Sequence, residues 1–194
     1  MNETLKLGLV LFIITVVSAS ILAISNDVTS IRIEEADRRA NDLAKQEVLE
    51  RAHSFKIMDK GRTKEIVGNN LNIMEINECY NDDNLMGYTF KTKIKGYGGE
   101  IELMVGISND GKVEGIKVLS HGETPGLGAN ATKAYFTDSF KNKSIGEKLV
   151  GAKDPKENNE VQALTSATIT TNAVVDGVNE IIEIYNSQLA NQAN

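Results

Sequence analysis

The stretch from Glu100 to Leu119 reads EIELMVGISNDGKVEGIKVL and decides the fold. Its first part, Glu100 to Ile107, has the composition of a strand, and Val113 to Leu119 alternates between polar and apolar residues. The Asp110-Gly111 pair between them is a strong signal for a tight turn, because glycine accepts the backbone angles that hairpin turns require. The stretch therefore predicts two antiparallel strands joined as a hairpin.

The segments around this hairpin extend it into an α+β domain. Tyr88 to Thr92 also alternates, and the sequence GYGG at Gly96 to Gly99 follows it, so we expect a third antiparallel strand. Helices are predicted near Asn130–Phe140 and from about Thr168 to Gln188. In the second helix, apolar residues recur three and four positions apart, at Val174, Val178, Ile181, Ile182 and Tyr185. The predicted architecture is an antiparallel sheet with flanking helices.

The N-terminal segment has the length and composition of a transmembrane helix. Leu7 to Ile24 reads LGLVLFIITVVSASILAI, which carries no charge and as a helix covers roughly 27 Å of the ~30 Å hydrocarbon core. A cleaved signal peptide has a shorter apolar region, of ~7–15 residues, after a strongly basic start, whereas only Lys6 stands here against Glu3. We therefore expect an uncleaved single span in the lipid bilayer of the cell membrane. A secreted soluble enzyme released by signal cleavage is the alternative.

Charges on either side of the span indicate its orientation. Lys6 precedes it and Asp27 follows it, which favours a cytoplasmic N-terminus and an extracytoplasmic domain. From Ile31 to about Phe55 the sequence is charged and helical in pattern, with Glu34/Arg38 as a favourable pair four residues apart. We expect a transmembrane anchor at 1–27, a stalk helix and linker at 28–60, and the folded domain at 61–194.

Composition excludes several classes of function. The formal net charge is −6 and the basic residues form no stripe, so we expect no nucleic acid as a partner. Cys79 is the one cysteine and lies in a polar stretch, which indicates an ordinary unpaired thiol. His53 and His121 are the two histidines, and they do not form an HExxH motif, so a metal site is not expected. Any redox chemistry would therefore require an organic cofactor.

Two loops carry residues suited to a ligand. The first, TSATITT at Thr165 to Thr171, is rich in small hydroxyl side chains and leads into the last predicted helix, whose free amides attract an anion such as phosphate. An ordinary helix cap would also explain it. The second, HGETPGLG at His121 to Gly128, has glycines that let the backbone approach a planar ligand closely, and Glu123 could hydrogen-bond the ligand or the neighbouring loop. A structural turn is the alternative for this loop.

Taken together, these motifs resemble the FMN-binding domain of the G subunit of the Rnf electron-transport complex. This family is related to the C subunit of the sodium-translocating NADH:quinone reductase. The resemblance covers nearly the whole chain and is carried by an N-terminal span, a helical stalk and four motifs. The motifs are GYxF at Gly87 to Phe90, GYGG, ETPGLG at Glu123 to Gly128, and an SGAT-type sequence at Thr165 to Thr168.

The resemblance implies where a cofactor is attached. In that family the last threonine of D-x-x-[ST]-G-A-T is esterified to the phosphate of FMN by a separate flavin transferase, and this position is Thr168 here. No catalytic residue is implied. This sequence departs from the motif at Gln162, where the family has aspartate, and at Ser166, where it has glycine. The other cofactor-binding residues expected from the two loops are Glu123, Thr124, Gly126, Leu127, Gly128, Thr165, Ser166, Ala167, Ile169 and Thr170.

The resemblance also implies a function that depends on other proteins. Such a flavoprotein subunit is not an enzyme alone, because it relays electrons between the other membrane subunits of an ion-translocating ferredoxin:NAD+ oxidoreductase. The resemblance implies that the coupling ion is Na+ or H+. The sequence leaves two alternatives open: a component like the C subunit of a sodium-translocating NADH:quinone reductase, and a non-redox assembly module in which Gln162 and Ser166 mark a degenerate flavin site.

Overall fold

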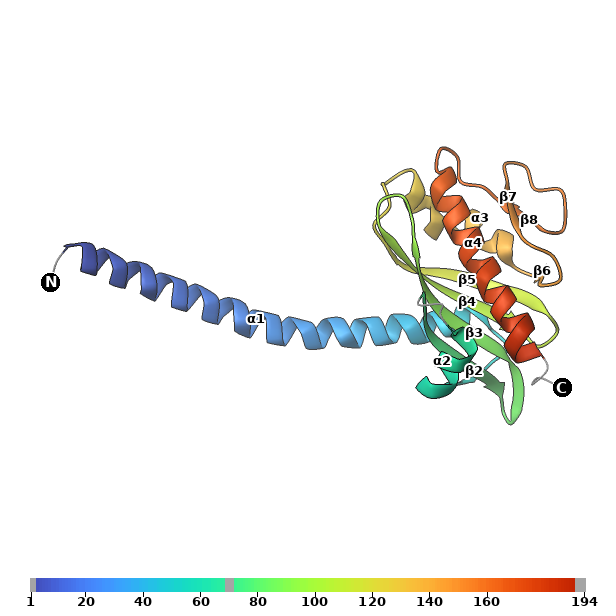
Figure 1. The fold of residues 1–194 in the computed structure, drawn as a ribbon, viewed down its shortest axis with the longest axis horizontal. Coiled ribbons are helices and arrows are strands. Elements are labelled where there is room, and N and C mark those ends of the chain that lie inside the picture. The colour runs from blue at the N-terminus through green and yellow to red at the C-terminus, as the bar shows by residue number, and fades with distance from the viewer. Residues whose placement is uncertain (1–2, 69–71, 191–194) are drawn as a thin grey trace. The chain divides into compact units, whose positions relative to one another are not determined.

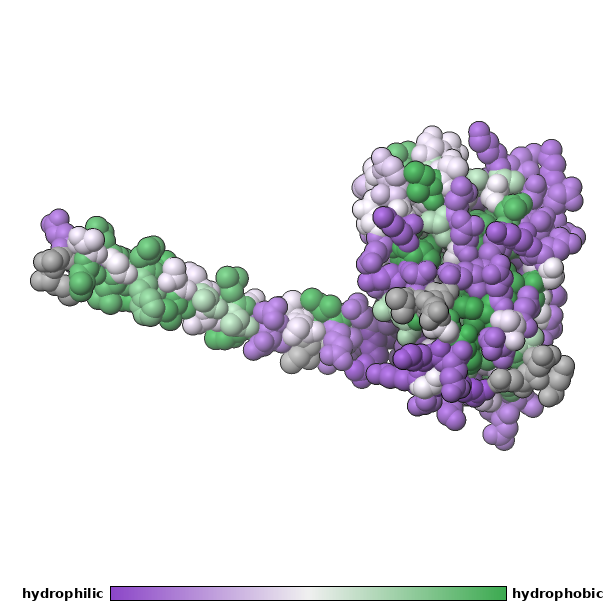
Figure 2. Space-filling view, viewed as in Figure 1, coloured by the Kyte–Doolittle hydropathy of each residue, from purple (hydrophilic) through white to green (hydrophobic). Residues whose placement is uncertain are grey.

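The computed structural model of the chain describes residues 3–68 and 72–190, and it divides after Asn41 into two compact units. The first unit is part of helix α1, which runs from Glu3 to Val48. By length and composition, α1 is the one helix among the described residues that could cross a membrane. Its large apolar side chains between Leu5 and Ile24 are exposed, and Figure 2 shows this half of the helix as largely apolar on the visible face. Such a surface is unfavourable in water, as expected for a membrane-associated protein.

The second unit is built on a six-stranded antiparallel sheet in the order β1-β2-β3-β4-β5-β6 (Figure 1). The predicted hairpin forms its β4–β5 pair, in which Gly106 lies opposite Gly115. A separate two-stranded parallel sheet, β7-β8, was not predicted. The strands are β1 (Ser54–Ile57), β2 (Ile73–Asn81), β3 (Asn84–Lys95), β4 (Glu100–Ser108), β5 (Lys112–His121), β6 (Lys143–Ser144), β7 (Val150–Ala152) and β8 (Glu160–Gln162).

Helix α4 (Thr168–Ile184) covers one face of the sheet (Figure 1). Its apolar residues at the predicted helical spacing are buried, and they pack with alternate residues of the central strands in the main hydrophobic core. Tyr185 follows α4 and meets Tyr88 of β3 edge to face, with ring centroids 6.0 Å apart. The predicted α+β architecture of sheet and flanking helix is therefore confirmed.

The last two turns of α1 cover the opposite face of the sheet. Ala44 and Val48 pack on Met104 of β4, and a Cβ atom at Gly106 would collide with the carbonyl oxygen of Val48. The glycine in this strand therefore allows two backbones to approach closely. Burial on both faces also explains why the sequence of β4 is apolar almost throughout rather than alternating.

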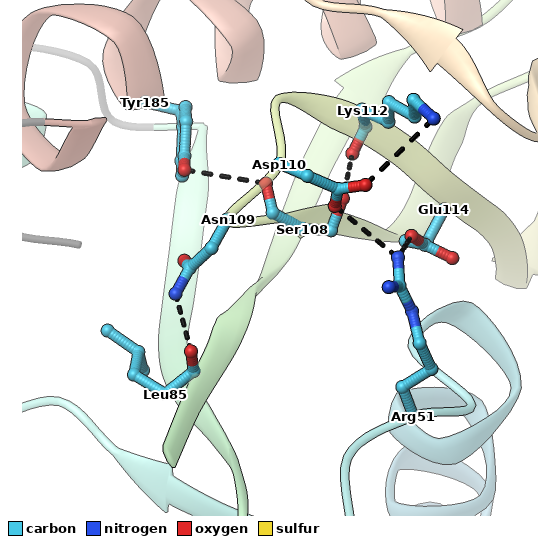
Figure 3. A network of polar contacts seen from close by, with 8 residues as sticks. All are labelled: Arg51, Leu85, Ser108, Asn109, Asp110, Lys112, Glu114 and Tyr185. Carbon is cyan, nitrogen blue, oxygen red and sulfur yellow. Dashed lines mark hydrogen bonds and ion pairs between the residues drawn. The ribbon is translucent and has the colours of Figure 1, made fainter. Parts of the chain in front are cut away.

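A polar network fixes the far end of the β4–β5 hairpin (Figure 3). Arg51 forms ion pairs with Glu114 and Asp110, and the second of these spans 3.3 Å. The hydroxyl group of Tyr185 donates to the carbonyl oxygen of Ser108 over 3.4 Å, and the Asn109 side chain donates to the carbonyl oxygen of Leu85. The turn is thus joined both to the segment after α1 and to the segment after α4.

Several elements differ from their predictions. The helix expected to reach Phe55 ends at Val48, because Phe55 instead pairs with Cys79 in the β1–β2 ladder. The polar stretch around Cys79 is β2, which was not predicted. The helix expected near Asn130–Phe140 is three short pieces: η1 (Gly128–Thr132), α3 (Ala134–Thr137) and η2 (Asp138–Phe140). Helix α2 (Lys60–Val67) and the π-helical turn η3 (Tyr185–Leu189) complete the fold. The predicted boundaries at residues 27 and 60 stay predictions.

Candidate functional site

Three segments far apart in the sequence line one cavity of about 350 Å³. They are the β3–β4 turn, the loop after β5, and the first turn of α4 with the residues before it. The lining residues are Tyr97, Glu123, Thr124, Leu127, Gly128, Ser166, Ala167, Thr168, Ile169 and Thr170. The two loops that the sequence singled out therefore face each other across a shared space.

The buried carboxylate of Glu123 holds the three segments together. Glu123 is 5% exposed. Its Oε1 accepts a hydrogen bond from the backbone N–H of Gly98 over 2.9 Å, and its Oε2 accepts one from the Thr170 hydroxyl over 2.5 Å. A buried carboxylate is costly unless it is hydrogen-bonded, and here both oxygens have donors. The sequence left open whether Glu123 faces a ligand or the neighbouring loop, and its two bonds are to the neighbouring segments.

Glycines around Glu123 make room for its side chain. A Cβ atom at Gly96 would collide with Glu123 Oε1, and one at Gly128 would collide with Oε2. A Cβ atom at Gly98 would likewise collide with the carbonyl oxygen of Gly122. The GYGG and ETPGLG sequences therefore pack against each other, with the Glu123 carboxylate between them.

The first turn of α4 presents amide groups that no side chain caps. Ala167 occupies the N-cap position and forms no side-chain capping hydrogen bond. Thr171 is buried, accepts from the Leu164 amide over 3.0 Å, and donates to the Ala167 carbonyl oxygen over 3.0 Å. Thr168 is exposed at the first helical position and lines the cavity. A helix N-terminus of this kind attracts an anion through its amides and the helix dipole.

The other predicted site residues separate into two groups. Thr124, Leu127, Gly128, Ser166, Ala167, Ile169 and Thr170 line the cavity with Glu123 and Thr168, whereas Thr165 and Gly126 do not. Gly126 instead has φ of +78°, which suits a turn in the loop. Tyr97 lines the cavity and was not predicted as a site residue, although the GYGG sequence that contains it was singled out as a motif. Its position between two glycines was the signal that could have identified it.

Ser166 adopts a backbone conformation that favours glycine, with φ of +60°. The left-handed region costs a residue with a Cβ atom about 1–2 kcal/mol, whereas glycine loses about 0.5–1 kcal/mol through its greater freedom when unfolded. We therefore expect Ser166→Gly to raise the free energy of unfolding by about 0.5–1 kcal/mol. Urea unfolding of the full chain in detergent measures the change. Thr165→Gly, at a position without positive φ, should lower stability, and a less stable Ser166→Gly would contradict the strain argument.

Gln162 has bonds that an aspartate could not form. Its side-chain amide donates to the carbonyl oxygen of Lys153 over 3.1 Å and to that of Ala163 over 3.2 Å. An ionised carboxylate only accepts hydrogen bonds. Where the family motif has aspartate, Gln162 therefore forms hydrogen bonds of its own to the backbone before the Thr165 to Thr171 loop.

Cys79 does not line the cavity, and its thiol is unreactive. Its side chain is fully buried in β2, and burial raises the pKa of the thiol to about 11. The thiolate is the reactive form of cysteine, so this thiol is unreactive near neutral pH. The structure agrees with the prediction of an ordinary unpaired thiol, although the residue lies in a strand rather than in a polar loop.

Comparison with known families defines the class of this site. The family described as "FMN-binding domain" matches residues 96–183, which span the GYGG turn, the ETPGLG loop and nearly all of α4. The three segments that line the cavity all lie in this range. The cavity therefore lies within a segment that matches a flavin mononucleotide-binding domain.

Longer similarity places the chain in a particular family. It is 39% identical to the G subunit of the Na+-translocating ferredoxin:NAD+ oxidoreductase complex of Acetobacterium woodii, over 93% of this chain and 90% of that protein. It is 27% identical to the G subunit of an ion-translocating oxidoreductase complex of Methanosarcina acetivorans, over 96% and 97% of the two chains. The chain therefore belongs to the family of G subunits of ion-translocating oxidoreductase complexes. The resemblance predicted from the motifs is confirmed.

Solved structures support the fold. The C subunit of the Na+-translocating NADH-quinone reductase from Parabacteroides distasonis matches with a TM-score of 0.57 and 16% identity, over 81% of this chain and 98% of that one. Shewanella oneidensis NqrC matches with a TM-score of 0.53 and 22% identity, over 61% of this chain and 60% of that one. At these identities the likeness establishes a shared fold.

The residues of the cavity fit FMN chemically. The uncapped start of α4 suits the phosphate, and the exposed Thr168 hydroxyl lies beside it. Tyr97, Leu127 and Ile169 supply apolar surface for a flat ring system. Ligand sites commonly combine an apolar lining with a few placed polar groups, and this cavity has that composition.

Proposed function

We propose that this chain is the flavoprotein subunit of a membrane-bound, ion-translocating ferredoxin:NAD+ oxidoreductase, and that it relays electrons through FMN esterified to Thr168. The observation that carries the proposal is the position of Thr168. Its hydroxyl is exposed at the uncapped N-terminus of α4, in the cavity that also contains the ETPGLG loop. Membership of the G-subunit family supports the wider assignment.

Each group of residues would have a distinct task in this function. FMN supplies the redox chemistry. The first amides of α4 bind the phosphate, because they point along the helix axis and have no other cap. Thr168 is an attachment point rather than a catalytic nucleophile, so it prevents loss of the cofactor. Glu123 joins the segments that line the cavity through its hydrogen bonds to Gly98 and Thr170.

The attachment also suggests what tunes the cofactor. A phosphoester bond lies at the far end of FMN from the isoalloxazine ring, so it leaves the reduction potential of that ring largely unchanged. The potential would then depend on the apolar and polar groups around the ring. Attachment by a separate flavin transferase, with the other subunits as electron donor and acceptor, completes the proposal.

Membrane topology forms part of the same proposal. The apolar half of α1 would be a single span in the bilayer, with the N-terminus in the cytoplasm. Lys6 before the span and Asp27 after it support this orientation. The flavin domain would then lie outside the cytoplasm.

Intact mass and the visible spectrum test the proposal directly. We expect the full chain, purified in detergent from cells that also produce a flavin transferase, to exceed its sequence mass by one FMN less one water. We also expect flavin absorption that bleaches on reduction with dithionite. A chain with the unmodified mass and no flavin absorption would contradict the proposal and favour the non-redox assembly module.

A further inference from the structure

The β3–β4 turn carries an exposed aromatic side chain at the edge of the cavity. Tyr97 lies between Gly96 and Gly98, lines the cavity, and is 70% exposed. Aromatic side chains contribute most when a large part of their surface is removed from water, so the exposed face of Tyr97 is available to a ligand that binds in this cavity.

The backbone on both sides of Tyr97 is held in place by the site itself. Gly96 donates to the carbonyl oxygen of Gly99 over 2.8 Å, which closes the turn. Gly98 donates to Glu123 over 2.9 Å, and its Cα approaches Gly122 too closely for any Cβ atom. Two glycines would ordinarily make this segment flexible, but here a bond within the turn holds Gly96, and the Glu123 carboxylate holds Gly98. The turn therefore presents the Tyr97 ring from a fixed backbone.

Two further apolar side chains are exposed in the way that Tyr97 is. Leu127 of the ETPGLG loop is 42% exposed, and Ile169 in the first turn of α4 is 57% exposed. Both line the same cavity. Three apolar groups from three separate segments thus surround one space, next to the helix terminus suited to phosphate. This arrangement matches a ligand with an anionic end and a flat, largely apolar end.

We propose that Tyr97 stacks on the isoalloxazine ring of FMN and lowers the midpoint potential of the flavin. The face of an aromatic ring carries partial negative charge, and a stacked ring also excludes water. Both effects disfavour the reduced flavin, which gains negative charge. This inference rests on the proposed attachment of FMN to Thr168, and it adds the residue that adjusts the bound ring.

Two substitutions separate the effect of ring stacking on the midpoint potential from the effect of the phenol group on flavin fluorescence. A stacked tyrosine quenches flavin fluorescence, because its phenol ring donates an electron to the excited flavin and receives it back. Tyr97→Phe keeps the ring face but donates poorly, so flavin emission should rise several-fold while the midpoint potential changes little. Tyr97→Ala removes the ring, so emission should rise and the potential should also shift upward.

Tyr135 provides a matched control. It is 53% exposed and does not line the cavity, so Tyr135→Ala should leave both emission and potential unchanged. The experiment uses the full chain in detergent, produced together with the flavin transferase. Native emission is divided by the flavin fluorescence of the denatured band, which corrects for differences in flavin attachment among the variants. A purely structural role of Tyr97 would not produce this pattern.

The outcomes distinguish the two proposals. Normal flavin in the denatured bands, with unchanged native emission in both Tyr97→Phe and Tyr97→Ala, would overturn the stacking proposal and leave the flavin attachment intact. Absence of flavin from the wild-type band would overturn the attachment, and the stacking proposal with it. Increased emission in both Tyr97 variants, with a higher potential in Tyr97→Ala alone, would support the proposal.

Discussion

Replacing Thr168 with alanine is expected to abolish flavin fluorescence in the denatured protein band. The substitution removes the hydroxyl oxygen that would carry the phosphoester, and no change in folding is needed for the loss. Thr168 is exposed at the first position of α4, where alanine is well tolerated, so stability should change little. Fluorescence of the chain on a denaturing gel measures the attachment, and the total protein stain corrects for its amount.

Two variants sharpen this test. Thr168→Ser keeps a hydroxyl group at the same position and should retain fluorescence. Thr165→Ala removes a hydroxyl group from the same loop, but Thr165 does not line the cavity, so the band should remain fluorescent. If Thr168→Ala keeps its flavin, Thr168 is not the attachment site. Loss of flavin from Thr165→Ala as well would mean that the whole loop, rather than one oxygen, determines attachment.

The second large effect is expected at Glu123. Glu123→Ala leaves the buried Thr170 hydroxyl and the part-buried Gly98 amide without their acceptor, and an unsatisfied buried polar group costs about 1–3 kcal/mol. It also leaves an empty space between glycines that have no side chains to fill it. We expect the free energy of unfolding to fall by about 2–4 kcal/mol. Urea unfolding followed by circular dichroism measures this loss.

The amide variant separates hydrogen bonding from charge at the same place. Glutamine keeps the size of the side chain and can still accept from Gly98, so Glu123→Gln should lose only about 1 kcal/mol. Glu147 is an exposed glutamate outside the cavity, and Glu147→Ala should change stability by less than about 0.5 kcal/mol. An effect of Glu123→Ala no larger than that of Glu147→Ala would show that the three segments do not depend on the carboxylate.

The parts of the fold that the sequence predicted are those with strong local signals. Asp110-Gly111 between two strand-like runs predicted the central hairpin, and the spacing of apolar residues predicted α4. The segment around Cys79 was missed because β2 has polar residues, such as Asn77 and Glu78, at buried positions where neighbouring elements cover them. Such burial depends on tertiary contacts, and local periodicity does not report it.

The cavity could be predicted in part for a similar reason. Its two loops carry unusual compositions of glycine and threonine, so they stand out in the sequence. Tyr97 stood out only as part of the GYGG sequence, and a tyrosine in a turn has many explanations until the structure shows what the turn faces. The bonds of Glu123 to Gly98 and Thr170 join residues distant in sequence, and no local pattern predicts such pairs.

The bonds of Glu123 have a consequence for the speed of electron transfer. A flavin changes its charge whenever it accepts or donates an electron, and loosely held surroundings must rearrange each time. Here one carboxylate fixes the β3–β4 turn and the first turn of α4 to the loop between them. Preorganised groups need no such rearrangement at the moment of reaction. If FMN binds as proposed, these fixed protein groups would contribute little to the reorganisation energy, which suits a cofactor that passes electrons on rather than transforming a substrate.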